Sequence, residues 1–173
     1  AVGLMKGTGD GADLEMALDR IQGITFTIRA MGVEEEALAM TEAEIAAALE
    51  NVTDADTIPA WGRAYAAYAV KEGITNGVSA SEFVFAPFAK LSGKQFITMM
   101  LRALGYTGVT LDNCLEKAIA AGMLTAGKAV EFGTQDQLLR DGAAYIIYST
   151  AKNGLVADED GVTPSDMTLI GKL

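Results

Sequence analysis

The clearest hydrophobic pattern along the chain lies between residues 92 and 104. Behind Ser92, apolar side chains recur three and four positions apart, as on one face of an α-helix, at Phe96, Met99, Met100, Ala103 and Leu104. Ser92 and Gln95 have the spacing of a capping box, in which each side chain hydrogen-bonds to the backbone amide of the other residue. The pattern therefore predicts a helix over 92–104 that buries one continuous stripe.

Two further segments have the same construction. Asp19 and Gln22 can form a similar box at the start of a helix over 19–31, and a third apolar helix is predicted over 139–152. The first two helices end on matching text, IRAMG at 28–32 and LRALG at 101–105. Self-similarity of this kind indicates tandem repeats.

Each of the three helices follows a loop that contains glycine, at Gly3, Gly73 or Gly122. In the second unit, Thr57 as cap and Pro59 in the first turn predict a leading helix that runs to Glu72. Its face of Trp61, Tyr65, Tyr68 and Ala69 is expected in the core, with a ligand platform as the alternative, and the third unit is expected to use Leu111, Leu115, Ala118 and Ile119 in the same way.

We therefore predict an all-α fold of three tandem helix–loop–helix repeats, arranged with pseudo-threefold symmetry around a central three-helix core. Repeat one spans 1–32 without its leading helix, and an acidic segment with one short helix spans 33–56. Repeats two and three span 57–106 and 107–155, and a tail spans 156–173. In that tail we expect a closing helix from Thr163-Pro164-Ser165-Asp166, packed where the missing leading helix would lie.

The acidic segment begins with the glutamates at 34–36, which are expected to form a solvated face rather than a metal site. Thr41 and Glu44 predict the capping box of its short helix. Residues 1–57 hold 3 basic and 12 acidic side chains, whereas residues 58–173 hold 10 and 11, for a net charge of −10 over the whole chain. This balance disfavours nucleic acid as a partner, because phosphate binding needs an excess of cations.

Residue counts narrow the chemistry further. The chain has no histidine, which excludes histidine-dependent triads and imidazole metal sites, and its single cysteine, Cys114, is expected to be an inert, half-buried thiol. We predict no cofactor, no metal site and no catalytic residues. No apolar run approaches the ~20 residues that a membrane-spanning helix needs.

Three stretches resemble the S-layer homology domain. They are residues 61–77, which run from WGRAYAAYA to GITNG, residues 96–106 (FITMMLRALGY) and the opening residues 3–11 (GLMKGTGDG). The resemblance covers most of residues 1–155. It implies a non-catalytic module on the outside of a bacterium, at the cell wall, that anchors surface proteins by binding secondary cell wall polysaccharide, often one that carries pyruvate ketals.

The family's signature Thr-Arg-Ala-Glu is altered at each second-helix start. Asp19–Gln22 keeps the arginine as Arg20, Ser92–Gln95 replaces it with Gly93 beside Lys94, and Leu139–Gly142 keeps it as Arg140 but loses the box. Arginine with free amides at a helix start could hold a ketal carboxylate. The alternative is that these arginines pair with neighbouring carboxylates and hold the repeats together.

The predicted ligand-binding residues come from these starts and from the glycine loops. The loops at 8–11 and 75–79 could line grooves for a sugar or could serve only as tight turns. The set comprises Arg20, Gln22, Lys94, Gln95, Arg140, Trp61, Gly7 and Gly77. A second hypothesis is a degenerate module that serves protein–protein assembly, through self-association or contacts with other surface-layer subunits. An enzyme is disfavoured, because no acid/base pair in the sequence is flanked by the aromatic subsites that a glycosidase uses.

Overall fold

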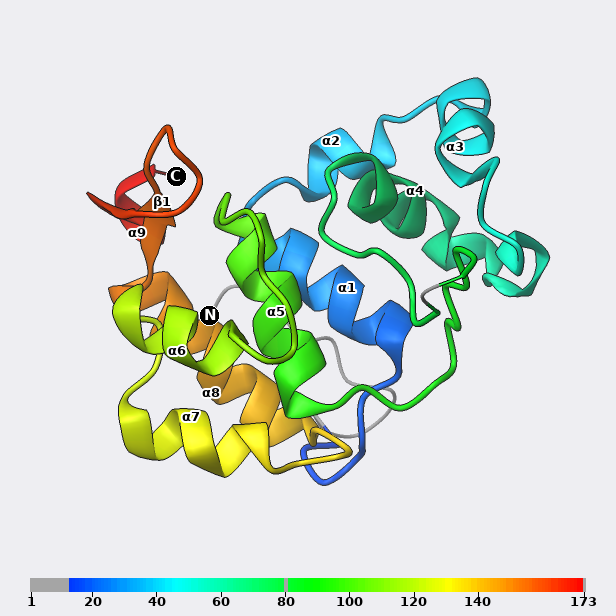
Figure 1. Cartoon of the computed structure of the whole chain (residues 1–173). Helices are drawn as coiled ribbons and strands as arrows, with labels where there is room; N and C mark the ends of the chain where they lie inside the picture. The colour runs from blue at the N-terminus through cyan, green and yellow to red at the C-terminus, as the bar shows by residue number, and fades with distance from the viewer. Residues whose placement is uncertain (1–12, 80, 173) are drawn as a thin grey trace.

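The computed structural model describes residues 13–79 and 81–172, which are mostly helical (Figure 1). The all-α prediction is confirmed at this level, with a small two-stranded sheet added near the C-terminus. The α-helices are α1 (Arg20–Ala30), α2 (Glu34–Leu38), α3 (Glu42–Leu49), α4 (Arg63–Lys71), α5 (Gly93–Ala103), α6 (Cys114–Ala120), α7 (Ala126–Gly133), α8 (Arg140–Asn153) and α9 (Leu169–Lys172). Two 3-10 helices, η1 (Ala55–Thr57) and η2 (Ala60–Gly62), precede α4, and the strands are β1 (Leu155–Ala157) and β2 (Pro164–Thr168).

Helices α1, α5 and α8 form the centre of the fold, and each of them packs against the other two. Their bounds agree with the predicted ranges because the expected capping boxes start α1 and α5. At α5, the Ser92 hydroxyl accepts a hydrogen bond from the Gln95 amide at 3.2 Å, and the Gln95 side chain accepts one from the Ser92 amide at 3.0 Å. Met100 and Ile147 are buried on these helices, as is Thr27 on α1.

A closed ring of backbone hydrogen bonds joins the three segments that lead into these helices. The Leu18 amide donates to the Leu138 carbonyl at 2.9 Å, the Leu91 amide to the Leu18 carbonyl at 2.9 Å, and the Leu138 amide to the Leu91 carbonyl at 2.7 Å. Each leucine directly precedes an N-cap residue and is fully buried. The ring fixes the three helix starts side by side without leaving a buried amide unpaired.

Each central helix also has an outer neighbour. Helix α4 packs on α1, α6 packs on α5, and the short α9 packs on α8. Gly73 after α4 and Gly122 after α6 have φ values of +65° and +67°, as expected of glycines that end helices in the left-handed conformation. Gly3 lies outside the described residues.

The predicted start of the leading helix α4 is wrong. Thr57 closes η1, where its hydroxyl donates to the Asp54 carbonyl at 2.8 Å, and Pro59 caps η2, so that the α-helix begins only at Arg63. Trp61 therefore sits on a 3-10 turn and is 55% exposed rather than in the core. Leu111 and Ile119, at 46% and 41% exposed, also lie outside the core: Leu111 precedes α6, and Ile119 lies near the end of that seven-residue helix.

The acidic segment holds two helices rather than one. Besides α3, which starts at the predicted box of Thr41 and Glu44, the glutamates at 34–36 begin α2. They are only partly a solvated face, because Glu34 pairs with Arg29 at 2.8 Å and Glu36 accepts a hydrogen bond from the Tyr68 hydroxyl at 3.2 Å.

The tail corrects a further prediction. No helix starts at Thr163, since Pro164–Thr168 is strand β2, paired antiparallel with β1. Proline in an edge strand costs no ladder hydrogen bond, so Pro164 is compatible with the observed strand as well as with the predicted helix start. The helix that does form, α9, begins at the fully buried Leu169, whose amide donates to the Gly154 carbonyl at the end of α8. In the described part of the chain, no helix is long and apolar enough to cross a membrane.

Candidate ligand-binding groove

Arg20 is the first residue of α1, and the fold buries it almost completely, at 2% exposed. Its Nε donates to the Phe85 carbonyl at 2.9 Å and its Nη2 donates to the Thr75 hydroxyl at 3.0 Å. Both partners belong to the segment between α4 and α5, so Arg20 links the start of α1 to that segment. Burial lowers the pKa of Arg20 to about 10, and the nearby Asp54 carboxylate partly opposes that shift.

A cleft of about 160 Å³ lies beside Arg20, between the 75–78 loop and α5. Arg102, near the end of α5, is a second guanidinium in its lining, and Gln95 and Thr98 lie on the same helix between the two ends. The described lining residues are Arg20, Thr75, Asn76, Gly77, Val78, Gln95, Thr98, Met99, Arg102 and Leu111, which include no carboxylate. We call this the arginine cleft.

The two arginines of this cleft carry charge that the described residues do not neutralise by an ion pair. Arg102 donates from Nη2 to the Val109 carbonyl at 2.8 Å, and burial lowers its pKa. The charge of the Asp54 carboxylate acts on Arg20, but Asp54 accepts its hydrogen bonds from the backbone amides of Phe85 and Ala86, at 2.7 and 2.8 Å. Two guanidinium groups with amide and hydroxyl donors between them suit an anionic, hydroxylated ligand.

The expected contribution of free helix amides is wrong. The Arg20 amide donates to the Ala89 carbonyl and the Ile21 amide to the Pro87 carbonyl, both at 3.0 Å. The amides that open α5 and α8 are likewise used, by the carbonyls of Gln135 and Met16. Packing at the helix starts consumes these donors, so they are not available to hold an anion.

The structure brings three of the predicted residues together, since Arg20, Gln95 and Gly77 all line the arginine cleft. Gln22 lies half-buried outside that lining and accepts a hydrogen bond from the Asp19 amide at 3.3 Å. Lys94 and Trp61 also lie outside it, and Gly7 is beyond the described residues. Arg140 is buried at the start of α8, with its guanidinium 5.2 Å from the centre of the Phe26 ring, and it lines none of the described clefts around Arg20.

Sequence reasoning missed Arg102. The sequence does carry a signal for it, because Gln95, Thr98 and Arg102 follow each other at helical spacing along one face of α5. This polar face lies beside the apolar stripe that first identified the helix.

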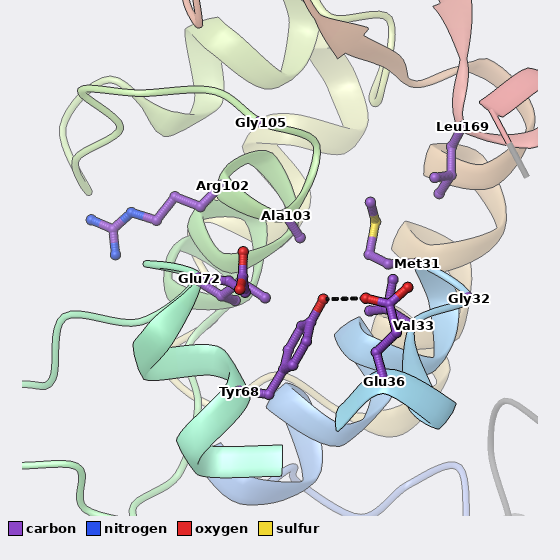
Figure 2. A pocket seen from close by; sticks show the side chains of 11 residues that line it. Met31, Gly32, Val33, Glu36, Tyr68, Glu72, Arg102, Ala103, Gly105 and Leu169 are labelled. Atoms are coloured by element: carbon purple, nitrogen blue, oxygen red, sulfur yellow. Dashed lines mark hydrogen bonds between the residues drawn. The ribbon is translucent and has the colours of Figure 1, made fainter. Parts of the chain in front are cut away.

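Two larger clefts adjoin the arginine cleft at Arg102. One, of about 540 Å³, shares Asn76 and Arg102 with it and extends along the loop of residues 105–110. The other, of about 470 Å³, lies where α1, α4 and α5 end, and is lined by Met31, Tyr68, Glu72, Glu36 and Leu169, among others (Figure 2). The three clefts together form a groove with Arg102 at their junction.

Comparisons with known proteins give no match to any family model, curated protein or solved structure. Within the described residues, no group of three or more Cys, Asp or Glu side chains is placed to hold a metal ion.

Proposed function

We propose that the chain is a non-catalytic anchoring module of the S-layer homology type, which binds secondary cell wall polysaccharide on the outside of a bacterium. In this proposal α1, α5 and α8 are the second helices of three tandem repeats related by pseudo-threefold symmetry. The arginine cleft between the first two repeats receives an acidic group of the polysaccharide, of which a pyruvate ketal is one example.

Support for the repeat arrangement comes from the ring of Leu18, Leu91 and Leu138. These three leucines hold the same position relative to the N-caps of α1, α5 and α8, and each donates to the next in turn. A closed, directional ring is what three equivalent segments around one axis would make.

The observation that carries the proposed function is the placement of Arg20 and Arg102 in one cleft without a lining carboxylate. A purely structural arginine that is buried is normally paired with an acid, because burying a lone charge is unfavourable. An acidic sugar would supply the missing negative charge, while Gln95, Asn76 and Thr98 would donate to or accept from its hydroxyl groups.

The test is retention of the protein on purified bacterial wall sacculi, before and after their secondary polysaccharide is removed. We expect retention that depends on the polysaccharide and that weakens about tenfold or more in Arg20→Gln and Arg102→Gln, the scale of a lost charge-assisted hydrogen bond. Lys152→Gln is the matched control, because it removes the same charge from an exposed residue outside the groove. Circular dichroism checks that each variant is folded, and equal retention on stripped sacculi would refute the proposal.

One observation favours assembly as a second candidate function. Tyr145 and Tyr148 are 39% and 65% exposed on α8, whereas the residues at the same distances from the N-caps of α1 and α5 are buried. An uncovered aromatic face is typical of an interaction surface. Sedimentation of the wild type and of Tyr148→Ser over a range of concentrations separates the two functions, because only assembly predicts mass that rises with concentration and falls in the variant.

A further inference from the structure

The groove changes its charge at Arg102. On one side lies the arginine cleft, with Arg20 and Arg102 in its lining. On the other side, both larger clefts are bordered by Glu72, and the one beneath Leu169 is also bordered by Glu36. A ligand long enough to pass Arg102 therefore meets two cations first and two carboxylates afterwards.

The two ends are continuous rather than separate sites. Asn76 and Arg102 line both the arginine cleft and the 540 Å³ cleft, and Gly105, Glu72 and Arg102 line both larger clefts. Figure 2 shows the Arg102 side chain extending away from Met31 and Leu169, whereas Glu72 and Glu36 lie close to Tyr68. Arg102 therefore borders the glutamate clefts as well, but its guanidinium is directed away from their far end, and among the described residues it forms no ion pair with Glu36 or Glu72.

The negative character of the far end is visible at Tyr68. Its hydroxyl donates to the Glu36 carboxylate at 3.2 Å, and burial, with the charges of Glu36 and Glu72 added, raises the pKa of Tyr68 to about 12. The one ion pair of these glutamates within the described residues is that of Glu72 with Lys71, at 4.0 Å between two exposed side chains, where pairing is weak. A second negative charge on the ligand would be repelled here.

We propose that the groove selects a charge pattern: a saccharide chain whose acidic unit lies between Arg20 and Arg102 and whose next unit carries no negative charge. This inference rests on the proposed function, because it describes how the charges are spaced along the polysaccharide that the anchoring module would bind. Asn76, Thr107 and Thr110, with the backbone of the glycine loop at 105–108, offer neutral hydrogen-bonding groups for the uncharged unit.

Three tetrasaccharides of matched length test the proposal by calorimetry. The hyaluronan tetrasaccharide carries a carboxylate on alternate units, tetragalacturonate carries one on every unit, and chitotetraose carries none. We expect affinity to fall about fivefold or more from hyaluronan to tetragalacturonate at low salt, with no measurable binding of chitotetraose. Equal affinities for the two acidic probes, or no binding of either, would overturn the proposal.

Variants separate charge from sugar stereochemistry. Glu72→Gln should strengthen tetragalacturonate binding and shrink the ratio between the acidic probes at least about twofold, while Glu116→Gln, an exposed change on α6 outside the groove, should leave it unaltered. An unchanged ratio in Glu72→Gln contradicts the proposal even if binding persists. If the protein is retained on sacculi but Glu72→Gln leaves the affinity ratio of the two acidic probes unchanged, the charge-pattern proposal fails and the anchoring function stands. If the probes are distinguished but the protein is not retained on sacculi, only the anchoring function is refuted.

Discussion

Helices α5 and α8 have the same place in the centre of the fold but very different surroundings. None of the residues of α5 is exposed, because α6 and α7 cover it, whereas α8 exposes a stripe of Asp141, Tyr145, Tyr148 and Lys152. Both helices are central and both bury an apolar face against the other two. The difference shows that the outer cover, rather than the inner stripe, decides how much of a central helix is core.

The largest effect that this comparison predicts concerns Leu101 and Tyr148. Each lies nine positions after its N-cap, at Ser92 or Leu139, yet Leu101 is fully buried and Tyr148 is 65% exposed. Leu101→Ala removes a packed side chain and should lower the free energy of unfolding by about 2–5 kcal/mol. Tyr148→Ala should change it by no more than about 0.5 kcal/mol.

Urea unfolding followed by circular dichroism measures both values. Similar losses in the two variants would mean that the aromatic face of α8 is covered in solution. That outcome would remove the difference between the helices on which the second candidate function depends.

A smaller effect is expected at the two helix starts. A Cβ added at Gly93 would lie 1.9 Å from the Phe132 carbonyl oxygen, whereas the same position in α8 holds the full side chain of Arg140. The start of α5 thus has no room for a side chain at residue 93, since the end of α7 occupies the space. Gly93→Ala should cost about 1–3 kcal/mol of unfolding free energy, because backbone must move.

Gly127→Ala is the control for this change. Gly127 is also helical, but a Cβ there meets nothing within 4 Å, so alanine should stabilise the protein by about 0.5–1 kcal/mol. If Gly93→Ala proved as stable as wild type, the packing of α7 against the start of α5 would be incorrect.

The sequence predicted the central helices well because local chemistry determines them. Ser92 with Gln95, and Asp19 with Gln22, start helices by hydrogen bonds that span only three positions, and the apolar stripe behind Ser92 has one period throughout. Gly73 and Gly122 end their helices for reasons that are equally local.

The predictions that were wrong concern features that depend on residues far apart in the sequence. Pro164–Thr168 becomes a strand because β1 is available to pair with it, and Gly93 excludes a side chain because Phe132 lies against it. Arg20 was identified from its position after the cap, but its partners Phe85 and Thr75 are 65 and 55 positions away. Position after a cap predicted that Arg20 and Arg140 would be alike, yet only Arg20 borders the arginine cleft.

The smallest expected effect is the chemical reactivity of Cys114, which reports whether α6 stays packed on α5. Cys114, at the start of α6, is fully buried, and burial raises the pKa of its thiol. Because the folded protein favours the neutral thiol, Cys114 contributes fully to the free energy of unfolding at pH values below the ordinary thiol pKa. That contribution is lost as the pH rises through the higher pKa of the folded state. We expect native Cys114 to resist iodoacetamide at neutral pH while Tyr148 is nitrated readily, with mass spectrometry locating each product. Rapid alkylation of Cys114 in the folded protein would show that α6 leaves α5 often, and that α5 and α8 differ less in solution than their exposed surfaces indicate.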